Sequence, residues 1–81
     1  MRRVAERVKV AAVFAPGCGI KPVWFEWHRH QHSITEMSYF WKDSQVAGTR
    51  LHFAVSDGSN LFELIFNPAN QDWTLEGVEG C

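Results

Sequence analysis

The sequence predicts an all-β fold: a curved antiparallel meander of about five to six strands that curls into a half-open barrel. Three observations support this. Apolar and polar residues alternate with a period of two, β-branched and aromatic residues dominate these segments, and clusters of Gly, Pro, Asp and Asn separate them. The 81 residues are 46% hydrophobic, which suits one domain, residues 1–81. We expect residues 20–78 to form the core meander and residues 1–15 to contribute an added N-terminal strand.

The first half of the chain contains three predicted strands. Residues 8–14 are rich in Val and Ala and end at the Pro and Gly turn cluster of residues 16–19. Residues 23–27 alternate strictly, with the odd-numbered side chains on the apolar face. Residues 32–41 form the third segment, whose alternation breaks at residues 37–38 and therefore predicts a bulge or a bend.

The second half contains three more predicted strands after a polar loop at residues 42–48. They cover residues 51–55, 61–66 and 72–78. The dipeptide Asp57-Gly58 is typical of a tight hairpin between the first two, and Pro68 indicates a turn before the last. All neighbouring strands are therefore expected to pair consecutively.

Turn positions also predict strand register. A two-residue turn at Asp57-Gly58 places Phe53 opposite Phe62 and, on the outer face, His52 opposite Glu63. A turn at Pro68 pairs the apolar residues of the last two strands, Phe66 with Trp73 and Leu64 with Leu75. In the first hairpin a wide loop over residues 28–31 pairs Trp27 with His32 and Phe25 with Ile34. The predicted core consists of Phe25, Ile34, Phe53, Phe62, Leu64 and Trp73.

A series of core and turn residues follows in a distinctive order: Pro22, Phe25, Trp27, Ile34, Glu36, Trp41, Gly58, Phe62-Glu63-Leu64 and Trp73. This order resembles a family of short bacterial all-β domains of unknown function. The resemblance covers roughly residues 20–78 and implies a fold more than an activity. Such domains commonly carry Gly in the first hairpin turn, where this chain has His28-Arg29-His30-Gln31.

Five outward-facing residues form the candidate binding surface, if the second to fifth predicted strands bring them together: Trp24, Glu26, Arg50, His52 and Glu63. A His beside carboxylates can act as a general acid or base, but no nucleophile lies in a recognisable motif. We expect cross-strand charge pairs rather than catalytic residues, and a protein that is not an enzyme.

Three alternating imidazoles, those of His28, His30 and His32, suggest a metal site. A structural zinc site needs four ligands, and only Cys18 and His52 are available to add to them. We therefore expect a polar hairpin loop without a metal or cofactor.

Charge gives little overall attraction to nucleic acid, because the formal net charge is -1 and the pI about 6.4. Exposed aromatics such as Trp24, with a basic patch at Arg2, Arg3, Arg7 and Lys9, leave weak binding of single-stranded nucleic acid as an alternative. The favoured interpretation is a non-enzymatic binding or assembly module with a protein partner, as a monomer or weak homodimer.

Cysteine usage bears on the compartment. Cys18 and Cys81 are far apart and do not indicate a disulfide framework, which favours a cytoplasmic protein. The chain contains no apolar run of the about 18 residues that a membrane helix requires.

Overall fold

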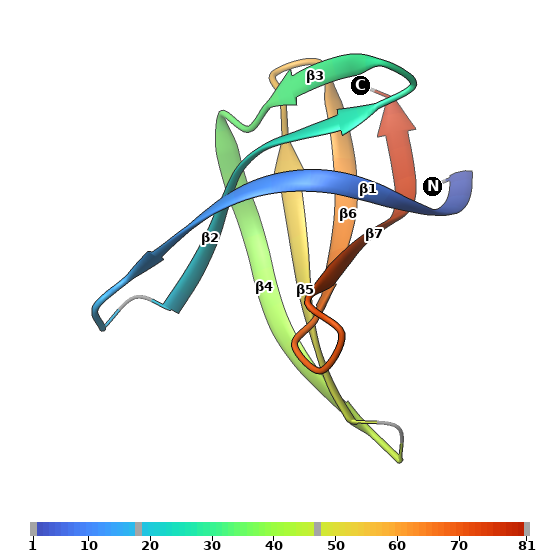
Figure 1. Cartoon of the computed structure of the whole chain (residues 1–81). Helices are drawn as coiled ribbons and strands as arrows, with labels where there is room; N and C mark the ends of the chain where they lie inside the picture. Colours follow the sequence, from blue (N-terminus) through green and yellow to red (C-terminus); the bar gives the residue numbers. More distant parts are fainter. Residues whose placement is uncertain (1, 18, 47, 81) are drawn as a thin grey trace.

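A computed structural model of the chain describes residues 2–17, 19–46 and 48–80, and it shows an all-β protein (Figure 1). The described residues form seven strands, one more than the upper end of the predicted range. They are β1 (Arg2–Ala15), β2 (Gly19–Trp27), β3 (His30–Ser33), β4 (Glu36–Gln45), β5 (Gly48–Ser56), β6 (Asn60–Asn67) and β7 (Asp72–Gly80). One antiparallel sheet holds them in the order β3-β2-β1-β7-β6-β5-β4, curled into a half-open barrel. The predicted fold class is confirmed.

The additional strand arises because the predicted segment 32–41 is two strands. β3 ends at Ser33, and the next two residues bridge to other parts of the sheet. The Ile34 N–H donates to the Val23 carbonyl at 3.0 Å, and the Thr35 N–H donates to the Ser56 carbonyl at 2.8 Å. The chain thus crosses from β2 to β5 at this point, and β3 and β4 lie at opposite ends of the sheet order.

The predicted loop at residues 42–48 is largely strand. β4 continues to Gln45 and pairs with β5, with Lys42 opposite Leu51 and Asp43 opposite Arg50. This part of the β4–β5 hairpin extends beyond the neighbouring strands, which explains its polar sequence (Figure 1). A polar strand that is solvated on both faces does not show the alternation by which strands are recognised.

The N-terminal strand, which the sequence suggested as an addition to the meander, lies in the middle of the sheet between β2 and β7. Its first half pairs with β7, ending at Val8 opposite Trp73, and its second half pairs with β2, beginning at Lys9 opposite Glu26. Register shifts interrupt both ladders, and Ala5 has a φ of 53° within the first interruption. Such bulges increase local twist, so β1 curves and turns β2 and β3 over the concave face of the remaining strands.

The core lies on this concave face. Its buried members are Phe25, Phe53, Val55, Phe62, Leu64, Phe66, Trp73 and Leu75. Five of the six predicted core residues belong to this set, while Ile34 is partly buried against it. Phe25 of β2 contacts Phe62 of β6 edge to face, with ring centroids 4.9 Å apart. Aromatic packing between these two side chains therefore holds β2 against β6.

The part of the chain that the structure describes contains no helix with the length and apolar character of a membrane span.

Candidate functional site: the outer polar cluster and an apolar cleft

Two of the predicted site residues, His52 and Glu63, meet on the outer face of β5 and β6. The Nδ1 atom of His52 lies 3.2 Å from Oε2 of Glu63, and Nε2 lies 3.7 Å from Oδ2 of Asp43. The imidazole also stacks on the Trp41 ring at a centroid distance of 4.8 Å. Arg50 lies on the same face of β5, opposite Asp43.

The predicted register of this hairpin is wrong by two residues. Ala54 lies opposite Glu63, and His52 lies opposite Ile65. The cause is a four-residue turn in which Oδ1 of Asp57 accepts from the N–H groups of Ser59 and Asn60, at 2.9 and 2.8 Å. A displacement of two residues leaves every side chain on its predicted face, so the His52–Glu63 contact still forms diagonally.

Both ring nitrogens of His52 are engaged or inaccessible. Nδ1 contacts Glu63, while Nε2 is buried from solvent and forms no hydrogen bond with the residues that the structure describes. The side chain is only 12% exposed because Trp41 covers it. An imidazole held in this way orders the outer face but presents no nitrogen to a substrate.

The other two predicted site residues lie elsewhere. Trp24 and Glu26 are on the outer face of β2, where they pair with Ala11 and Lys9 of β1. β1, β7 and β6 separate β2 from β5 in the sheet. Because the sheet is curled, the outer face of β2 points away from that of β5, and the five residues do not form one surface.

The three imidazoles of the first hairpin also separate. His28 stacks on Trp27, with ring centroids 4.2 Å apart, whereas His32 lies on Phe25 and contacts Oδ2 of Asp57 at 3.1 Å. No group of three or more His, Cys, Asp or Glu side chains suited to a metal ion occurs in the described part of the chain. Cys18 and Cys81 lie outside the described residues.

The first hairpin has a tight two-residue turn instead of the predicted wide loop. His28 and Arg29 have φ values of 52° and 65°, and Trp27 lies opposite His30. Phe25 consequently lies opposite His32, not Ile34. Two consecutive positive φ values usually require Asn or Gly, and neither occurs at these two positions, so the sequence favoured the wider loop. Here the packing of Trp27 and Phe25 against the core outweighs that local preference.

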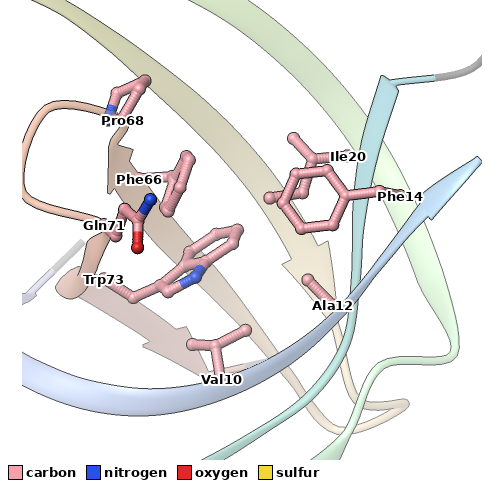
Figure 2. A pocket seen from close by; sticks show the side chains of 8 residues that line it. All are labelled: Val10, Ala12, Phe14, Ile20, Phe66, Pro68, Gln71 and Trp73. Atoms are coloured by element: carbon pink, nitrogen blue, oxygen red, sulfur yellow. The ribbon is translucent and has the colours of Figure 1, made fainter.

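An apolar cleft that the sequence did not predict opens between the end of the β1–β2 hairpin and the β6–β7 turn. Figure 2 shows Phe14 and Ile20 on one side, facing Phe66, Pro68 and Trp73 on the other. This part of the cleft has a volume of about 520 Å³. It is lined by Val10, Ala12, Phe14, Ile20, Phe66, Pro68, Gln71 and Trp73.

Two further hollows continue this cleft. One, of about 540 Å³, shares Phe14, Ile20, Phe66 and Pro68 with the first. The next, of about 390 Å³, shares Ile20 with both and reaches Phe40 and other residues of β4 and β5. The cleft therefore runs along the mouth of the half-open barrel, from β7 to β4.

The only sequence signal for the cleft is that apolar residues extend beyond what a short hairpin can bury. Phe14 and Ile20 flank the turn region and are paired with each other across it. The sequence places Phe14 at a strand end and Pro68 in a turn, and nothing in its pattern brings the two residues near one another. Their proximity depends on the curvature of β1.

Comparison with protein-family models, curated proteins and solved structures finds no significant match. The resemblance to small bacterial all-β domains accordingly stays a prediction.

Proposed function

We propose that the protein is a non-enzymatic binding module whose site is the apolar cleft at the mouth of the half-open barrel. The observation that carries the proposal is the composition of the cleft: three connected hollows lined mainly by apolar side chains from β1, β2, β4, β5, β6 and β7. Ligand sites in proteins are typically hollows of about 300–1,000 Å³ with such a lining.

Large apolar side chains that are exposed to solvent support the proposal that a ligand binds in the cleft. Phe14 is 73% exposed, and Met37 and Phe40 are 39% and 44% exposed. All three line the cleft. Contiguous exposed apolar surface on a small domain marks a site at which something else binds.

The outer polar cluster gives less support for an alternative activity. The ring nitrogens of His52 are occupied or buried, which favours a structural role over acid–base catalysis. The basic N-terminal patch is partly neutralised, because Arg3 lies 3.3 Å from Glu76 and Arg7 lies 3.7 Å from Asp72. Pairing with carboxylates reduces the charge offered to phosphates.

A neutral fluorescent probe, N-phenylnaphthylamine, tests the proposal. We expect its emission to rise on binding the protein, and Phe14→Glu to weaken this binding by at least about tenfold, because an aromatic side chain that lines the cleft is replaced by a carboxylate. Val13→Glu is the matched control, since Val13 is the neighbouring residue on the opposite face and is 50% exposed. Equal loss in both variants, or no binding to the parent protein, would contradict the proposal.

A second candidate function is weak self-association through the edge of β4. β4 ends the sheet order and pairs only with β5 in the described part of the chain. It also carries Tyr39, which is 65% exposed. An unpaired strand edge of this length is a template for a strand from another chain.

Hydrogen exchange combined with sedimentation tests this second candidate. We expect the β4 amides to become more protected as protein concentration rises and dimers form, while the interior β6 amides stay unchanged. A monomer at every concentration, with constant β4 exchange, would exclude self-association by this route.

A further inference from the structure

We infer that the ligand of the cleft is an elongated amphipathic anion, such as a fatty-acid carboxylate, with its chain along the cleft and its head at Lys42. This inference rests on the proposed function and adds the chemical class of the ligand. Three observations support it: the three hollows adjoin one another, Lys42 lies at one end of them, and Lys42 forms no ion pair with the other residues that the structure describes.

The row of adjoining hollows favours a long ligand over a compact one. Ile20 lines all three hollows, so they adjoin one another at this residue. From there the cleft extends in one direction to Trp73 and Gln71, and in the other to Met37 and Phe40. An extended hydrocarbon chain can contact the whole length, whereas a compact group would fill one hollow only.

Lys42 is the only charged residue lining the three hollows among the residues that the structure describes. It lies on the concave side of β4, opposite Leu51 and two residues beyond Phe40, which places it at one end of the cleft. A lysine stem packs on apolar surface while its ammonium stays at the solvent boundary. That arrangement suits a ligand whose apolar part is inside and whose charged group is at the rim.

The positive charge of Lys42 determines which head group of a ligand is preferred. No carboxylate lines the hollows in the described residues, and Asp43, the next residue of β4, is on the outer face beside His52. A carboxylate head at Lys42 therefore meets an opposite charge, and a cationic head meets a like charge. The cleft is expected to select anions over neutral and cationic amphiphiles of the same chain length.

Lys9 marks the alternative position for a head group, near the other end of the cleft. It lines an adjoining hollow together with Val10, Gln71 and Trp73. Arg7 and Asp72 also line that hollow and pair with each other at 3.7 Å, and Lys9 is opposite Glu26 across the β1–β2 ladder. Carboxylates therefore offset the positive charge there, and Lys42 is the more favourable position.

The experiment displaces bound N-phenylnaphthylamine with three amphiphiles of equal chain length: laurate, dodecanol and dodecyltrimethylammonium, each below its micelle concentration. In the parent protein we expect laurate to bind about threefold more tightly than dodecanol at low salt, the size of effect typical of an exposed ion pair. Dodecyltrimethylammonium should bind least, and added salt should reduce the differences.

Substitutions show which lysine is responsible for the preference for laurate. Lys42→Met should make laurate and dodecanol bind equally tightly, when the affinity of each is compared with that of the neutral probe for the same variant. Lys21→Met is the matched control, because Lys21 is an exposed lysine on the opposite face of β2, paired with Val13, and does not line the cleft. It should preserve the preference for laurate. Circular dichroism confirms that each variant is folded.

The outcomes separate this inference from the proposed function. If the probe binds but the parent protein does not distinguish the three head groups, the binding module stands and the anion inference is overturned. Loss of the preference in Lys9→Met rather than Lys42→Met also overturns it, since the head group then lies at the other end. If the neutral probe does not bind at all, both fail.

Discussion

The Phe62 side chain connects β6 with β2 and β3, across the concave face of the curled sheet. It is 1% exposed, and its ring packs against Phe25 at 4.9 Å and against His32 at 5.3 Å. Phe25 and His32 belong to β2 and β3, whereas Phe62 belongs to β6, so these contacts connect segments that no ladder joins directly. Removing the Phe62 ring therefore weakens the packing of β2 and β3 on β6, in addition to leaving a cavity where the ring was.

Phe62→Ala should lower the free energy of unfolding by about 3 to 5 kcal/mol, because it removes a buried ring and leaves a cavity. Urea titration followed by tryptophan fluorescence measures this. Phe14→Ala, at a side chain that is 73% exposed, is the control and should change stability by less than about 0.5 kcal/mol. A Phe62→Ala variant within about 1 kcal/mol of the parent protein would contradict the packing described here.

Asp57 links stability to pH. Burial raises the pKa of this carboxyl, but the N–H groups of Asn60 and Ser59 and the ring of His32 favour its charged form more strongly. The pKa in the folded protein therefore lies below its ordinary value. The carboxylate contributes stability that is fully present above the pKa of the unfolded chain and is lost as the pH falls through the folded-state pKa.

Acid titration of Asp57→Asn tests this linkage. The parent protein should lose stability as the pH falls below about 4, and the Asn variant should lose less over the same range, because it keeps an acceptor oxygen but has no proton to gain. Urea midpoints between about pH 2.5 and 5.5 provide the comparison. Identical pH profiles for the two proteins would show that Asp57 is not stabilised as a carboxylate.

For the strands and turns, the sequence predicted which face of the sheet each side chain occupies better than it predicted the registers between paired strands. Alternation assigned Phe53, Phe62 and Leu64 to the concave side, and all three are buried there. Registers depend on turn conformation, and two of the three predicted hairpin registers were displaced by two residues. Alternation cannot detect such a displacement, since it returns each side chain to the same face.

The β6–β7 hairpin shows when register prediction succeeds. Phe66 lies opposite Trp73 and Leu64 opposite Leu75, as the turn at Pro68 predicted. Here the Gln71 N–H donates to the Asn67 carbonyl at 2.7 Å, and Oδ1 of Asn67 accepts from the Ala69 N–H at 3.0 Å. In the β5–β6 hairpin Oδ1 of Asp57 accepts from two N–H groups in a turn of four residues, and the Asp-Gly motif alone does not reveal that length.

Arg29→Gly should stabilise the protein by about 1 kcal/mol, since Arg29 has a φ of 65° and a left-handed conformation is unfavourable for residues with a Cβ. Thermal unfolding should give a higher midpoint for this variant. Arg29→Ala removes the same side chain but keeps the Cβ, so it should give no such increase. A gain in the Ala variant equal to that in the Gly variant would indicate that the guanidinium, rather than the backbone, is unfavourable.

On the scale of the whole molecule, the candidate site depends on an arrangement that periodicity does not encode. The predicted turn placed His52 opposite Glu63; the register is displaced, but both residues belong to one local hairpin and share a face, so their contact still forms. The cleft requires Phe14 of β1 to approach Pro68, which follows only from the two ladders and the bulges of β1. Long-range curvature of this kind is a property of the assembled sheet.

Local stability should follow position in the sheet. We expect β6 and β7 to exchange their amide hydrogens most slowly in dilute solution, since each has a neighbouring strand on both sides and buried side chains on the concave face. β3 has four residues and a free edge, so it should exchange first. Native-state hydrogen exchange measures this order, and early exchange of β7 would indicate that the β1–β7 ladder opens readily.

The pairing of β1 with β7 has a consequence for how the nascent chain folds. On the ribosome, β1 leaves the exit tunnel first and β7 last of the seven strands, so the first half of β1 has no ladder partner until the whole domain is synthesised. The β4 to β7 hairpins can form locally in the meantime, whereas joining Val8 to Trp73 closes a loop spanning most of the chain. Such non-local closure is slow. The final, rate-limiting event in folding is therefore expected to be the docking of β1, with its attached β2, onto β7, and this same event creates the cleft.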